Sequence, residues 1–462
     1  MDLLIKNGTV VTATDTYRAD IRVSGEKIVQ IGDALDAEST TRVIDATGKY
    51  VLPGGIDPHT HLASPGQGTV TADDYRSGTI AAACGGTTSI INFCFQDKGD
   101  SLDYSLNRHV QNAADSAAID YGFHAMISDL TAAVQDEIAT LPARGVTSIK
   151  LFMAYRGSLM VDDRTIIKTL AEAKRNGILV MVHAENGDAA DFLQQQLLAQ
   201  GKLDPKYHAA SRPPRVEAEA TARAGALAEV VDAPIYFVHV SCSEAVEEIQ
   251  RARARGVDAM GETCTHYLYF DEEDLDRPGF EGAKWVYTPP PRGKHQPPLM
   301  WRAIANGSLG IVASDHCPFN FEGQKDLGKG DFTRIPNGAP GVEERLIFTY
   351  QGVVDGRLTL NGFVDLVSTR AAKTFGLYPD KGTIAIGSDA DLLVWDPTAE
   401  LNVTRSALHS SVDYTLYEGK KVRGLPETVA LRGAVIVENR EFVGQSGSGR
   451  YIVRKSYGGS HV

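Results

Sequence analysis

Short hydrophobic segments separated by turn signals mark both ends of the chain. They are rich in β-branched residues and too short for helices, so we predict β-strands. In the first fifty residues they are Leu3–Ile5, Thr9–Thr12, Asp20–Val23 and Ile28–Ile31. Near the C-terminus they are Asp391–Trp395, Asp413–Tyr417, Thr428–Leu431 and Ala434–Val437. Because each flank is too small for a core of its own, we expect residues 1–52 and 381–445 to form one composite β-sandwich, with two separate β modules as the alternative.

Residues 53–380 follow a different pattern, in which short apolar runs alternate with longer stretches of helical spacing. The pairs are Ser89–Phe93 with 101–118, Tyr121–Ile127 with 133–142, Ser148–Phe152 with 163–175, Ile178–His183 with 187–200, and Ile235–Val240 with 243–254. Gly310–Ala313 precedes a long loop. This alternation predicts a parallel α/β fold, and its length fits a (β/α)₈ TIM-like barrel of about 250 residues with insertions. A doubly wound sheet is the alternative, which the lack of a glycine-rich nucleotide motif after the early strands disfavours.

Composition and charge exclude several classes of protein. The chain has 462 residues, 43% of them hydrophobic and 23% charged, which is typical of a globular protein. Its net charge of −13 and its lack of a long basic run argue against nucleic acid or anionic membranes as partners. No signal peptide or run of 18 apolar residues is found. The five cysteines form no close pair, so we expect reduced thiols and a cytoplasmic location. Residues 446–462 are Gly/Ser-rich and locally basic, which predicts a disordered tail or an oligomerisation arm that packs on another subunit.

The strongest chemical signal is the segment Gly55-Ile56-Asp57-Pro58-His59-Thr60-His61. Two histidines at positions i and i+2 of a strand point to the same side, and at the C-terminal end of a first barrel strand that side is the barrel mouth. Two such imidazoles make half of a metal site. On this segment alone, two polar residues in a loop after a strand remain the alternative.

Four more ionisable residues lie at or near the ends of strand-like apolar runs. They are Lys150, His183, His239 and Asp315. A barrel places catalytic groups at such strand ends, and the intervals between the four residues fit strands four, five, six and eight. Singly, a strand-end histidine is more often a packing residue and a strand-end aspartate a helix cap. Because six such residues fall in register, we predict a metal site at the barrel mouth.

Lys150 lies within an apolar strand, where an unpaired ammonium group would be costly. Burial lowers the pKa of a lysine and makes the free amine available. A free amine reacts with carbon dioxide to give a carbamate, whose two oxygens can bridge two cations. Pairing with a carboxylate inside the barrel is the alternative. We interpret His316 and His124 as residues outside the ligand set, and Cys317 as unnecessary as a nucleophile if a metal site is present.

Longer segments carry a family signature. They are VIDATGKYVLPGGIDPHTH (43–61), CGGTTSIINF (84–93), SIKLFMAY (148–155), VHAEN (182–186), HAASRPPRVEAEATAR (208–223), FVHVSC (237–242), GETCTHYL (261–268), SDHCPF (314–319), IPNGAPGVEERL (335–346) and KGTIAIGSDADLLVWDP (381–397). By these segments the chain resembles the dihydropyrimidinase/D-hydantoinase family of the amidohydrolase superfamily along essentially its whole length. The histidine motifs are shared across the superfamily, whereas SDHCPF and IPNGAPGVEERL are more specific to cyclic amide and imide hydrolases.

The resemblance implies a barrel with a composite β-sandwich and two Zn²⁺ ions per subunit. It assigns the ligands residue by residue: His59, His61 and Asp315 for one ion, His183 and His239 for the other, and an N6-carboxylated Lys150 that bridges both together with a hydroxide. Tyr155 matches the tyrosine that stabilises the oxyanion. Thr288 and Asn337 match positions whose backbone groups bind the ring amide, and a serine replaces Thr288 in many relatives. An apolar wall beside the ring's exocyclic group could be formed by Leu62, Phe95, Phe152 and Tyr155.

The activity that the resemblance implies is hydrolysis of the cyclic amide bond of 5,6-dihydropyrimidines, of 5-substituted hydantoins, or of both, as in pyrimidine catabolism. The product is an N-carbamoyl amino acid, and Asp315 would carry the proton from the attacking hydroxide to the leaving nitrogen. An allantoinase or another cyclic amidohydrolase is the alternative; a dihydroorotase is disfavoured because no arginine follows His61. A non-catalytic interaction protein is the second alternative. The presence of all six ligand residues argues against it. The expected partners are a small cyclic ureide and further copies of the chain, in a homotetramer or homodimer.

Overall fold

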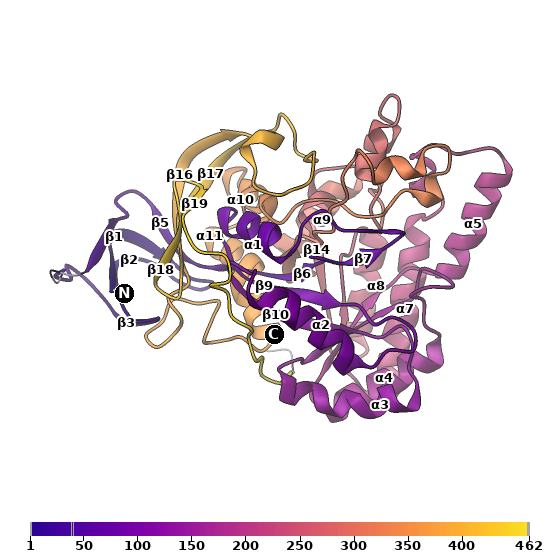
Figure 1. Cartoon of the computed structure of the whole chain (residues 1–462), viewed down its shortest axis with the longest axis horizontal. Coiled ribbons are helices and arrows are strands. Elements are labelled where there is room, and N and C mark those ends of the chain that lie inside the picture. The colour runs from indigo at the N-terminus through magenta and orange to yellow at the C-terminus, as the bar shows by residue number, and fades with distance from the viewer. Residues whose placement is uncertain (1, 38, 40, 460–462) are drawn as a thin grey trace.

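The computed structural model describes residues 2–37, 39 and 41–459. It consists of a nine-stranded sheet at one end of an elongated molecule and an eight-stranded barrel with its helices at the other (Figure 1). The sheet contains β1 (Leu3–Val11), β2 (Thr16–Ser24), β3 (Lys27–Gly32), β4 (Arg42–Asp45), β5 (Tyr50–Pro53), β16 (Leu392–Asn402), β17 (Lys421–Leu431), β18 (Ala434–Glu438) and β19 (Glu441–Phe442).

The two flanks of the chain share this sheet, as predicted. They are joined where β5 pairs antiparallel with β16, with Val51 opposite Val394. Side chains from both flanks, such as those of Ile21 and Leu392, pack in one apolar core. The predicted strand Asp413–Tyr417 is wrong: this segment runs through turns. Its apolar residues serve side-chain packing instead, since the ring of Tyr417 stacks on Phe348.

The barrel confirms the predicted fold class. Its eight strands are β6 (Gly55–Thr60), β9 (Thr87–Cys94), β10 (Asp120–Met126), β11 (Ser148–Phe152), β12 (Leu179–His183), β13 (Ile235–Phe237), β14 (Ala259–Cys264) and β15 (Ile311–Ala313). Neighbouring strands pair in parallel from β6 to β15. Almost every strand residue is buried, because side chains fill the interior and helices cover the outside.

The first and last strands meet through few backbone contacts. A single parallel bridge joins Thr60 to His316. The gap is reinforced by Arg345, a fully buried residue whose guanidinium donates to the Val312 carbonyl and lies 3.6 Å from Asp57 Oδ2. The backbone N–H of Ser314, just after β15, also donates to Asp57. Side chains rather than a continuous ladder therefore close the barrel where β6 and β15 bring their ends together.

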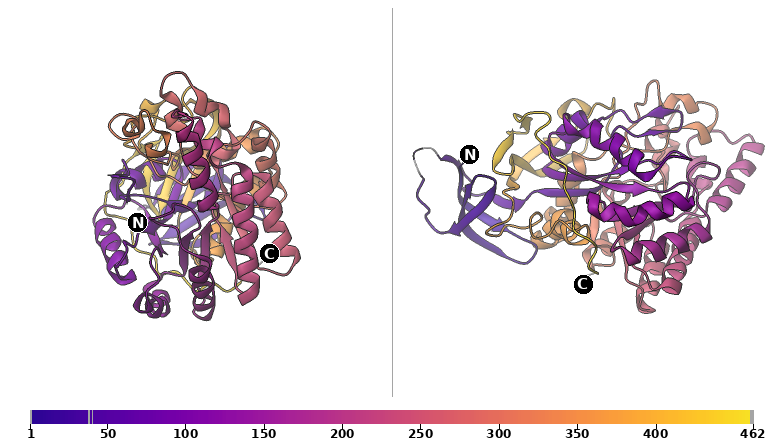
Figure 2. Two further views of the ribbon diagram at one scale, coloured as in Figure 1. Left: turned by 90° about the vertical axis from the view of Figure 1, so that its right-hand side faces the viewer. Right: turned by 60° about the horizontal axis from the view of Figure 1, so that its bottom comes forward.

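The helices surround the strands, as the end-on view in Figure 2 shows. They are α1 (Tyr75–Cys84), α2 (Leu102–Ala114), α3 (Ala132–Glu137), α4 (Asp163–Arg175), α5 (Gly187–Ala199), α6 (Tyr207–Ala210), α7 (Pro214–Val231), α8 (Ser243–Ala254), α9 (Gln296–Ala305), α10 (Glu344–Val354), α11 (Leu360–Val364) and α12 (Arg370–Thr374). Polar caps set their starts: the Ser101 hydroxyl accepts from the Tyr104 N–H, and the Asp162 carboxylate accepts from Thr165. The predicted helix 133–142 is divided between α3 and a 3₁₀ helix, η1 (Ile138–Arg144).

The C-terminal segment packs on the barrel of its own chain. Figure 2 shows it running from the sheet toward the barrel. The N–H of Ile452 donates to the Tyr121 carbonyl and that of Tyr457 to the Gly177 carbonyl, both at the N-terminal end of the barrel. Arg454 is buried there and donates to the Phe123 carbonyl and the Ser148 hydroxyl. Buried polar contacts thus hold residues 446–459 against the barrel of their own chain. Residues 460–462 lie outside the described part.

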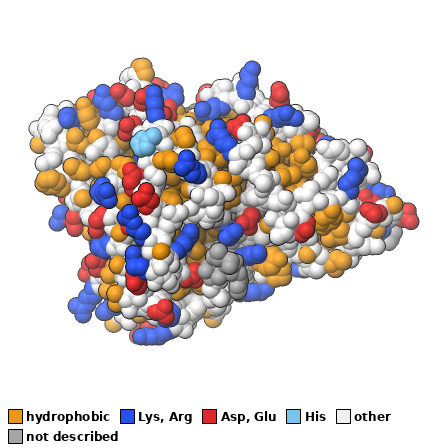
Figure 3. Space-filling view, turned by 180° about the vertical axis from the view of Figure 1, so that it is seen from behind, with side chains coloured by type: hydrophobic (Ala, Val, Ile, Leu, Met, Phe, Trp, Pro, Cys, Tyr) orange, Lys and Arg blue, Asp and Glu red, His pale blue; other side chains and the backbone are white. Residues whose placement is uncertain are grey.

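The surface view in Figure 3 shows side chains of both charges mixed with apolar ones over one face. Within the described residues, we find no helix that combines the length and the apolar character needed to span a bilayer.

The division of the chain into domains of residues 1–52 with 381–445, 53–380 and 446–462 stays a prediction.

Candidate metal centre

All six predicted ligand residues line one cavity at the C-terminal end of the barrel strands. The cavity has a volume of about 250 Å³. Its candidate ligands are His59, His61, Lys150, His183, His239 and Asp315. His59 lies in β6, Lys150 in β11 and His183 at the end of β12. His61, His239 and Asp315 follow β6, β13 and β15. Barrel strands one, four, five, six and eight therefore supply the six side chains, as the sequence intervals predicted.

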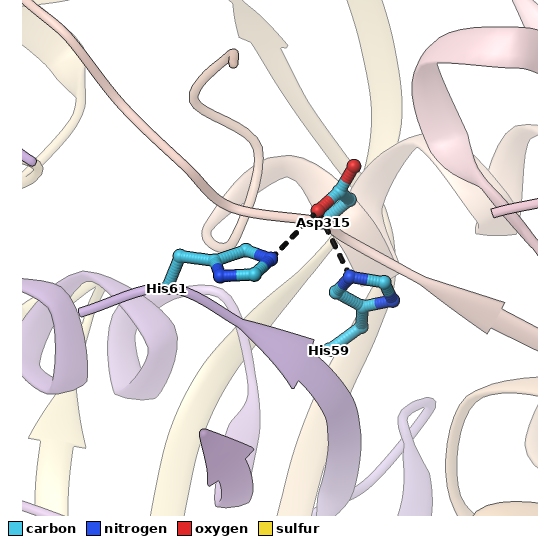
Figure 4. Close-up of side chains that lie close together, drawn as sticks. All are labelled: His59, His61 and Asp315. Atoms are coloured by element: carbon cyan, nitrogen blue, oxygen red, sulfur yellow. Dashed lines mark ion pairs between the residues drawn. The ribbon is translucent and has the colours of Figure 1, made fainter. Parts of the chain in front are cut away.

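Three of these side chains converge closely. Asp315 Oδ1 lies 3.0 Å from His59 Nε2 and 3.3 Å from His61 Nε2 (Figure 4). Each residue offers a ligand atom within 4.8 Å of the other two. Burial lowers the pKa of His61 to about 4, which favours the neutral imidazole that a metal requires. Burial also lowers the pKa of His59, but the carboxylates of Asp315 and Glu262 outweigh it and raise the pKa to about 9.

The other two histidines face the same cavity from the opposite side. The ring centroids of His183 and His239 are 4.5 Å apart, and those of His59 and His239 are 5.3 Å apart. Burial lowers the pKa of both His183 and His239, so both favour the neutral form. Two groups of imidazoles thus meet at one place, which is the donor set that two adjacent cations require.

Two glutamates orient the histidines from behind. Glu185 Oε2 contacts His183 Nε2 at 2.7 Å, and Glu262 Oε1 contacts His59 Nδ1. Each contact engages one ring nitrogen of a cavity-lining histidine, the arrangement common among metal-bound histidines. Glu262 also accepts from the Tyr236 hydroxyl at 2.8 Å, which fixes its position. The sequence pattern missed both glutamates, although they lie in the quoted segments VHAEN and GETCTHYL.

Lys150 lies between the two histidine groups. Its side chain is 1% exposed, and its Nζ is 4.8 Å from the ring centroids of Phe93 and Phe152. Burial lowers the pKa of this lysine to about 8, although Asp315 and Glu262 act in the opposite direction. No hydrogen bond or ion pair to a described residue engages the Nζ atom. The predicted alternative, a direct ion pair with a carboxylate in the barrel, is therefore absent from the described residues.

The donor set fits a metal centre on a further observation. His239 Nδ1 is fully buried and makes no hydrogen bond with any described residue. Leaving a buried polar atom without a partner costs about 1–3 kcal/mol, so such atoms usually have a ligand. His239 and Asp315 also have positive φ angles, of 40° and 48°, which are unfavourable for these residue types and typical of functional positions.

A second group of possible ligands shares Asp315. Cys264 and His266 offer atoms within 4.8 Å of it and of each other. Burial raises the pKa of the Cys264 thiol well above its ordinary value, and thiols bind metals as thiolates. Burial lowers the pKa of His266 to about 4, and this histidine does not line the cavity. The first group, which opens to the cavity, is therefore the better metal centre.

The predicted substrate residues divide into two groups. Tyr155, Phe152, Thr288 and Asn337 line the cavity. Burial raises the pKa of Tyr155 to about 12, so its hydroxyl stays available as a donor. Leu62 does not line the cavity: its side chain is fully buried against Gly78 of α1, where a β-carbon would lie 2.3 Å from Leu62 Cδ2. Its apolar character therefore serves packing, and we do not retain it as a substrate contact.

The three residues placed outside the ligand set have partners or positions of their own. His316 contacts Asp73 at 3.0 Å, and its other ring nitrogen accepts from Gly341. His124 contacts the Ser148 hydroxyl and lies 2.8 Å from the Pro58 carbonyl oxygen. Cys317 lines the cavity, but burial raises the pKa of its thiol above the ordinary value, which argues against a thiolate nucleophile.

One residue that the sequence analysis did not assign links the metal centre to the tyrosine. Arg212, in the quoted segment HAASRPPRVEAEATAR, is buried and donates to Glu185 at 2.7 Å. Its guanidinium also lies 5.5 Å from the ring centroid of Tyr155. Arg212 therefore contacts both the glutamate behind His183 and the predicted oxyanion donor. An arginine in a loop between helices carries no periodic signal, which is why the sequence pattern did not identify it.

Comparisons with known proteins agree with the barrel and with the candidate metal centre described above. The sequence profile described as "Amidohydrolase family" matches residues 50–422. The chain is 55% identical over 457 residues to a D-hydantoinase of Ralstonia pickettii, covering 99% of this chain and 100% of the relative. It is 40% identical over 453 residues to a dihydropyrimidinase of Arabidopsis thaliana, covering 97% of this chain and 85% of the relative. The crystal structure of a dihydropyrimidinase from Brevibacillus agri superposes with a TM-score of 0.98 at 52% identity, covering all of both chains.

Proposed function

The chain belongs to the amidohydrolase family, within the branch of the dihydropyrimidinases and D-hydantoinases, and is a hydrolase of cyclic amides. We propose that it hydrolyses 5-substituted hydantoins and 5,6-dihydropyrimidines to N-carbamoyl amino acids. One observation carries the proposal. Six metal-binding side chains and the Tyr155 hydroxyl line a single cavity of about 250 Å³ at the end of the barrel where such folds place their active sites. That volume suits a small ring.

We propose that the cavity holds two Zn²⁺ ions. His59, His61 and Asp315 would hold one ion, His183 and His239 the other, and a carbamate on Lys150 would bridge them. A pKa of about 8 keeps part of the lysine as the free amine that reacts with carbon dioxide. When bound, two such cations lower the pKa of a shared water and polarise the substrate carbonyl. The unpartnered Nδ1 of His239 and the approach of His59 and His61 to Asp315 support this assignment.

The residues of the chain have separate roles in the proposed reaction. Backbone groups of Thr288 and Asn337 would hold the ring amide and orient its carbonyl toward the histidines. The Tyr155 hydroxyl would donate a hydrogen bond to the carbonyl oxygen as negative charge develops there, an interaction worth about 3–4 kcal/mol in other enzymes. Asp315 would accept the proton of the attacking water and deliver it to the ring nitrogen as the C–N bond breaks. One water is consumed and the ring opens.

The choice of substrate follows from the relatives and from the cavity wall. The relatives reported above carry the names D-hydantoinase and dihydropyrimidinase, so we propose both ring types and a preference for D-hydantoins. Phe152, Phe95 and Leu159 form an apolar part of the wall, which supports an apolar substituent on the ring. An allantoinase, the alternative from the sequence, would have to hold a polar ureido group in the same place.

Parallel assays test the proposal. The enzyme is incubated separately with hydantoin, D- and L-phenylhydantoin, dihydrouracil and allantoin, and the open-ring products are quantified. We expect N-carbamoyl products from the first four, with the D enantiomer faster than the L enantiomer. Hydrolysis of allantoin alone would contradict the substrate proposal. Asp315→Asn should lower kcat by about 10²-fold or more if Asp315 carries the proton; a fall below tenfold would contradict that role.

Assembly, domain division and location are also proposals. We propose a homotetramer or homodimer, which light scattering can distinguish from a monomer. We propose the domains 1–52 with 381–445 and 53–380, and residues 446–462 as a C-terminal tail or oligomerisation arm, of which residues 446–459 pack on the base of the barrel. A cytoplasmic location is supported by the five cysteines, all of which are unpaired thiols.

A further inference from the structure

A glutamine on the rim of the cavity makes a two-point contact with the predicted substrate site. Gln67 lies between the short strands β7 (Pro65–Gly66) and β8 (Thr69–Val70), and both Gln67 and Asn337 line the cavity. The Gln67 Nε2 donates to the Asn337 carbonyl at 3.2 Å, and the Asn337 N–H donates to Gln67 Oε1 at 2.7 Å. The side-chain amide therefore occupies both backbone groups of Asn337 at once.

This pairing reproduces the hydrogen bonds that a cyclic amide would make. In a lactam ring the N–H and C=O lie cis, so a backbone N–H and C=O can bind both, just as Asn337 binds the primary amide of Gln67. We propose that Gln67 is an internal stand-in for the ring amide, which substrate must displace from Asn337, so that Gln67 sets the affinity for substrate. The inference rests on the proposed function, because there Asn337 holds the ring amide.

The surroundings of Gln67 allow its side chain to leave. The residue is exposed and has a φ of 53°, next to Gly68 with a φ of 82° and open space around it. Other residues hold the hairpin: the Ser64 N–H donates to the Thr71 hydroxyl at its base, and Gln324 donates to Thr69 and Val70 of the second strand. Movement of the tip therefore does not require the hairpin to unfold.

The size of the effect follows from how weak exposed hydrogen bonds are. Two bonds that compete with water contribute modestly, so the paired state is favoured by a moderate factor. A ligand that binds only the open state has its apparent affinity reduced by the open fraction. We therefore expect removal of the Gln67 amide to lower KM about three- to tenfold and to leave kcat within twofold, because Gln67 touches none of the six ligand residues.

Steady-state kinetics on hydantoin and dihydrouracil test the inference. Gln67→Met keeps the length of the side chain and removes both hydrogen bonds. Thr69→Val is the matched control, since it removes the contact of Thr69 with Gln324 in the same hairpin and keeps Gln67. The expected result is a lower KM for Gln67→Met and both constants within twofold for Thr69→Val. An unchanged or higher KM for Gln67→Met in an active enzyme overturns the inference. A wild-type enzyme that hydrolyses no cyclic ureide overturns the proposed function instead, and this inference falls with it.

A crystal of Asp315→Asn soaked with hydantoin gives a second reading that does not depend on turnover. We expect the ring amide on the backbone of Asn337 and the Gln67 side chain displaced. Bound hydantoin with Gln67 still paired to Asn337 overturns the inference.

Discussion

Asp315 Oδ1 lies 3.0 Å from Nε2 of His59, although the two residues belong to the last and the first strand ends of the barrel. Their proximity depends on closure of the barrel, where Asp57 accepts from the Ser314 N–H and faces Arg345. The contacts that close the fold and those that assemble the metal centre are thus adjacent. A substitution that opens the joint between β6 and β15 would separate His59 from Asp315, which we propose as ligands of one ion.

Replacing Lys150 tests the bridging ligand. In Lys150→Met we expect metal content to fall from about two ions per chain to one or fewer, because the group proposed to hold both ions is lost. Activity should fall by roughly 10³-fold or more, equivalent to about 4 kcal/mol. Metal analysis and hydantoin hydrolysis are the measurements. Lys325→Met is the matched control, since Lys325 is also a fully buried lysine but is not among the cavity's lining residues; it should keep its metal.

The carbamate has its own test. Metal-free enzyme is reloaded with zinc in buffer freed of carbon dioxide, with and without added bicarbonate. We expect activity to return fully only with bicarbonate, and faster at pH 8.5 than at pH 7, because the pKa of Lys150 is near 8 and only the free amine reacts. Equal recovery without bicarbonate would exclude the carbamate while leaving the metal centre in place.

Tyr155→Phe separates oxyanion stabilisation from metal binding. Loss of one such donor lowers kcat by about 10²–10³-fold in other enzymes, and we expect a similar fall with an unchanged metal content. Because burial raises the pKa of Tyr155 to about 12, its hydroxyl stays protonated, so the wild-type rate should show no fall from this group between pH 6 and pH 10. Loss of metal in the variant would show that the tyrosine acts on the fold of the site instead.

The two glutamates behind the histidines should affect different ions. Glu185→Gln removes the carboxylate that contacts His183, and Glu262→Gln removes the one that contacts His59. Such outer partners typically change metal affinity by about 10–100-fold. Competition with a chelator should therefore show one weakened ion in each variant and two in the double variant. Equal weakening of both ions by either single change would contradict the assignment of histidines to ions.

The buried Lys325 should make the free energy of unfolding depend on pH. Its Nζ donates to the carbonyls of Val286 and Pro336, and burial lowers its pKa to about 7. An unfolded lysine titrates near 10.4, so between about pH 7 and 10 the unfolded chain binds a proton that the folded chain does not. The folded state therefore gains stability as pH rises, by at most about 1.4 kcal/mol per pH unit. The Tm of the wild type minus that of Lys325→Met should increase from pH 7 to pH 10.

Lys381→Met is the control for this measurement. Lys381 is also buried, and Asp391 and Asp120 contact its Nζ at 2.6 and 2.7 Å. Burial lowers its pKa, but Asp391 and Asp389 outweigh burial and raise it. Its stabilisation is complete below its unfolded pKa, so the difference in Tm between wild type and this variant should be flat from pH 7 to pH 9.5. A flat difference for Lys325→Met as well would contradict the lowered pKa of Lys325.

The sequence predicted those parts of the molecule that have a local signal. An apolar run that ends in an ionisable residue, such as Ile178–His183, reports a barrel strand and its functional end together. The strand β14 gives no such signal, because its residues Ala259–Cys264 include glycine and a buried glutamate. That glutamate, Glu262, contacts His59, and sequence spacing cannot report such a contact.

Features that depend on distant packing could not be read from the pattern. The Gly/Ser-rich composition after Gly444 is typical of a free tail, yet Arg454 is buried at the base of the barrel. Leu62 follows the metal motif directly, which suggested a place in the cavity, but its side chain turns toward α1. The pairing of Gln67 with Asn337 joins two loops far apart in the chain, and neither residue indicates the other.

The central claim is that six side chains, Lys150 among them, hold two ions that together hydrolyse a cyclic amide. Titration of metal-free enzyme with zinc, in the presence of bicarbonate, tests it most directly when hydantoin hydrolysis is followed at each addition. We expect activity to rise with added zinc and to reach its plateau at two ions per chain. Full activity before any zinc is added, or a plateau at one ion, would contradict it.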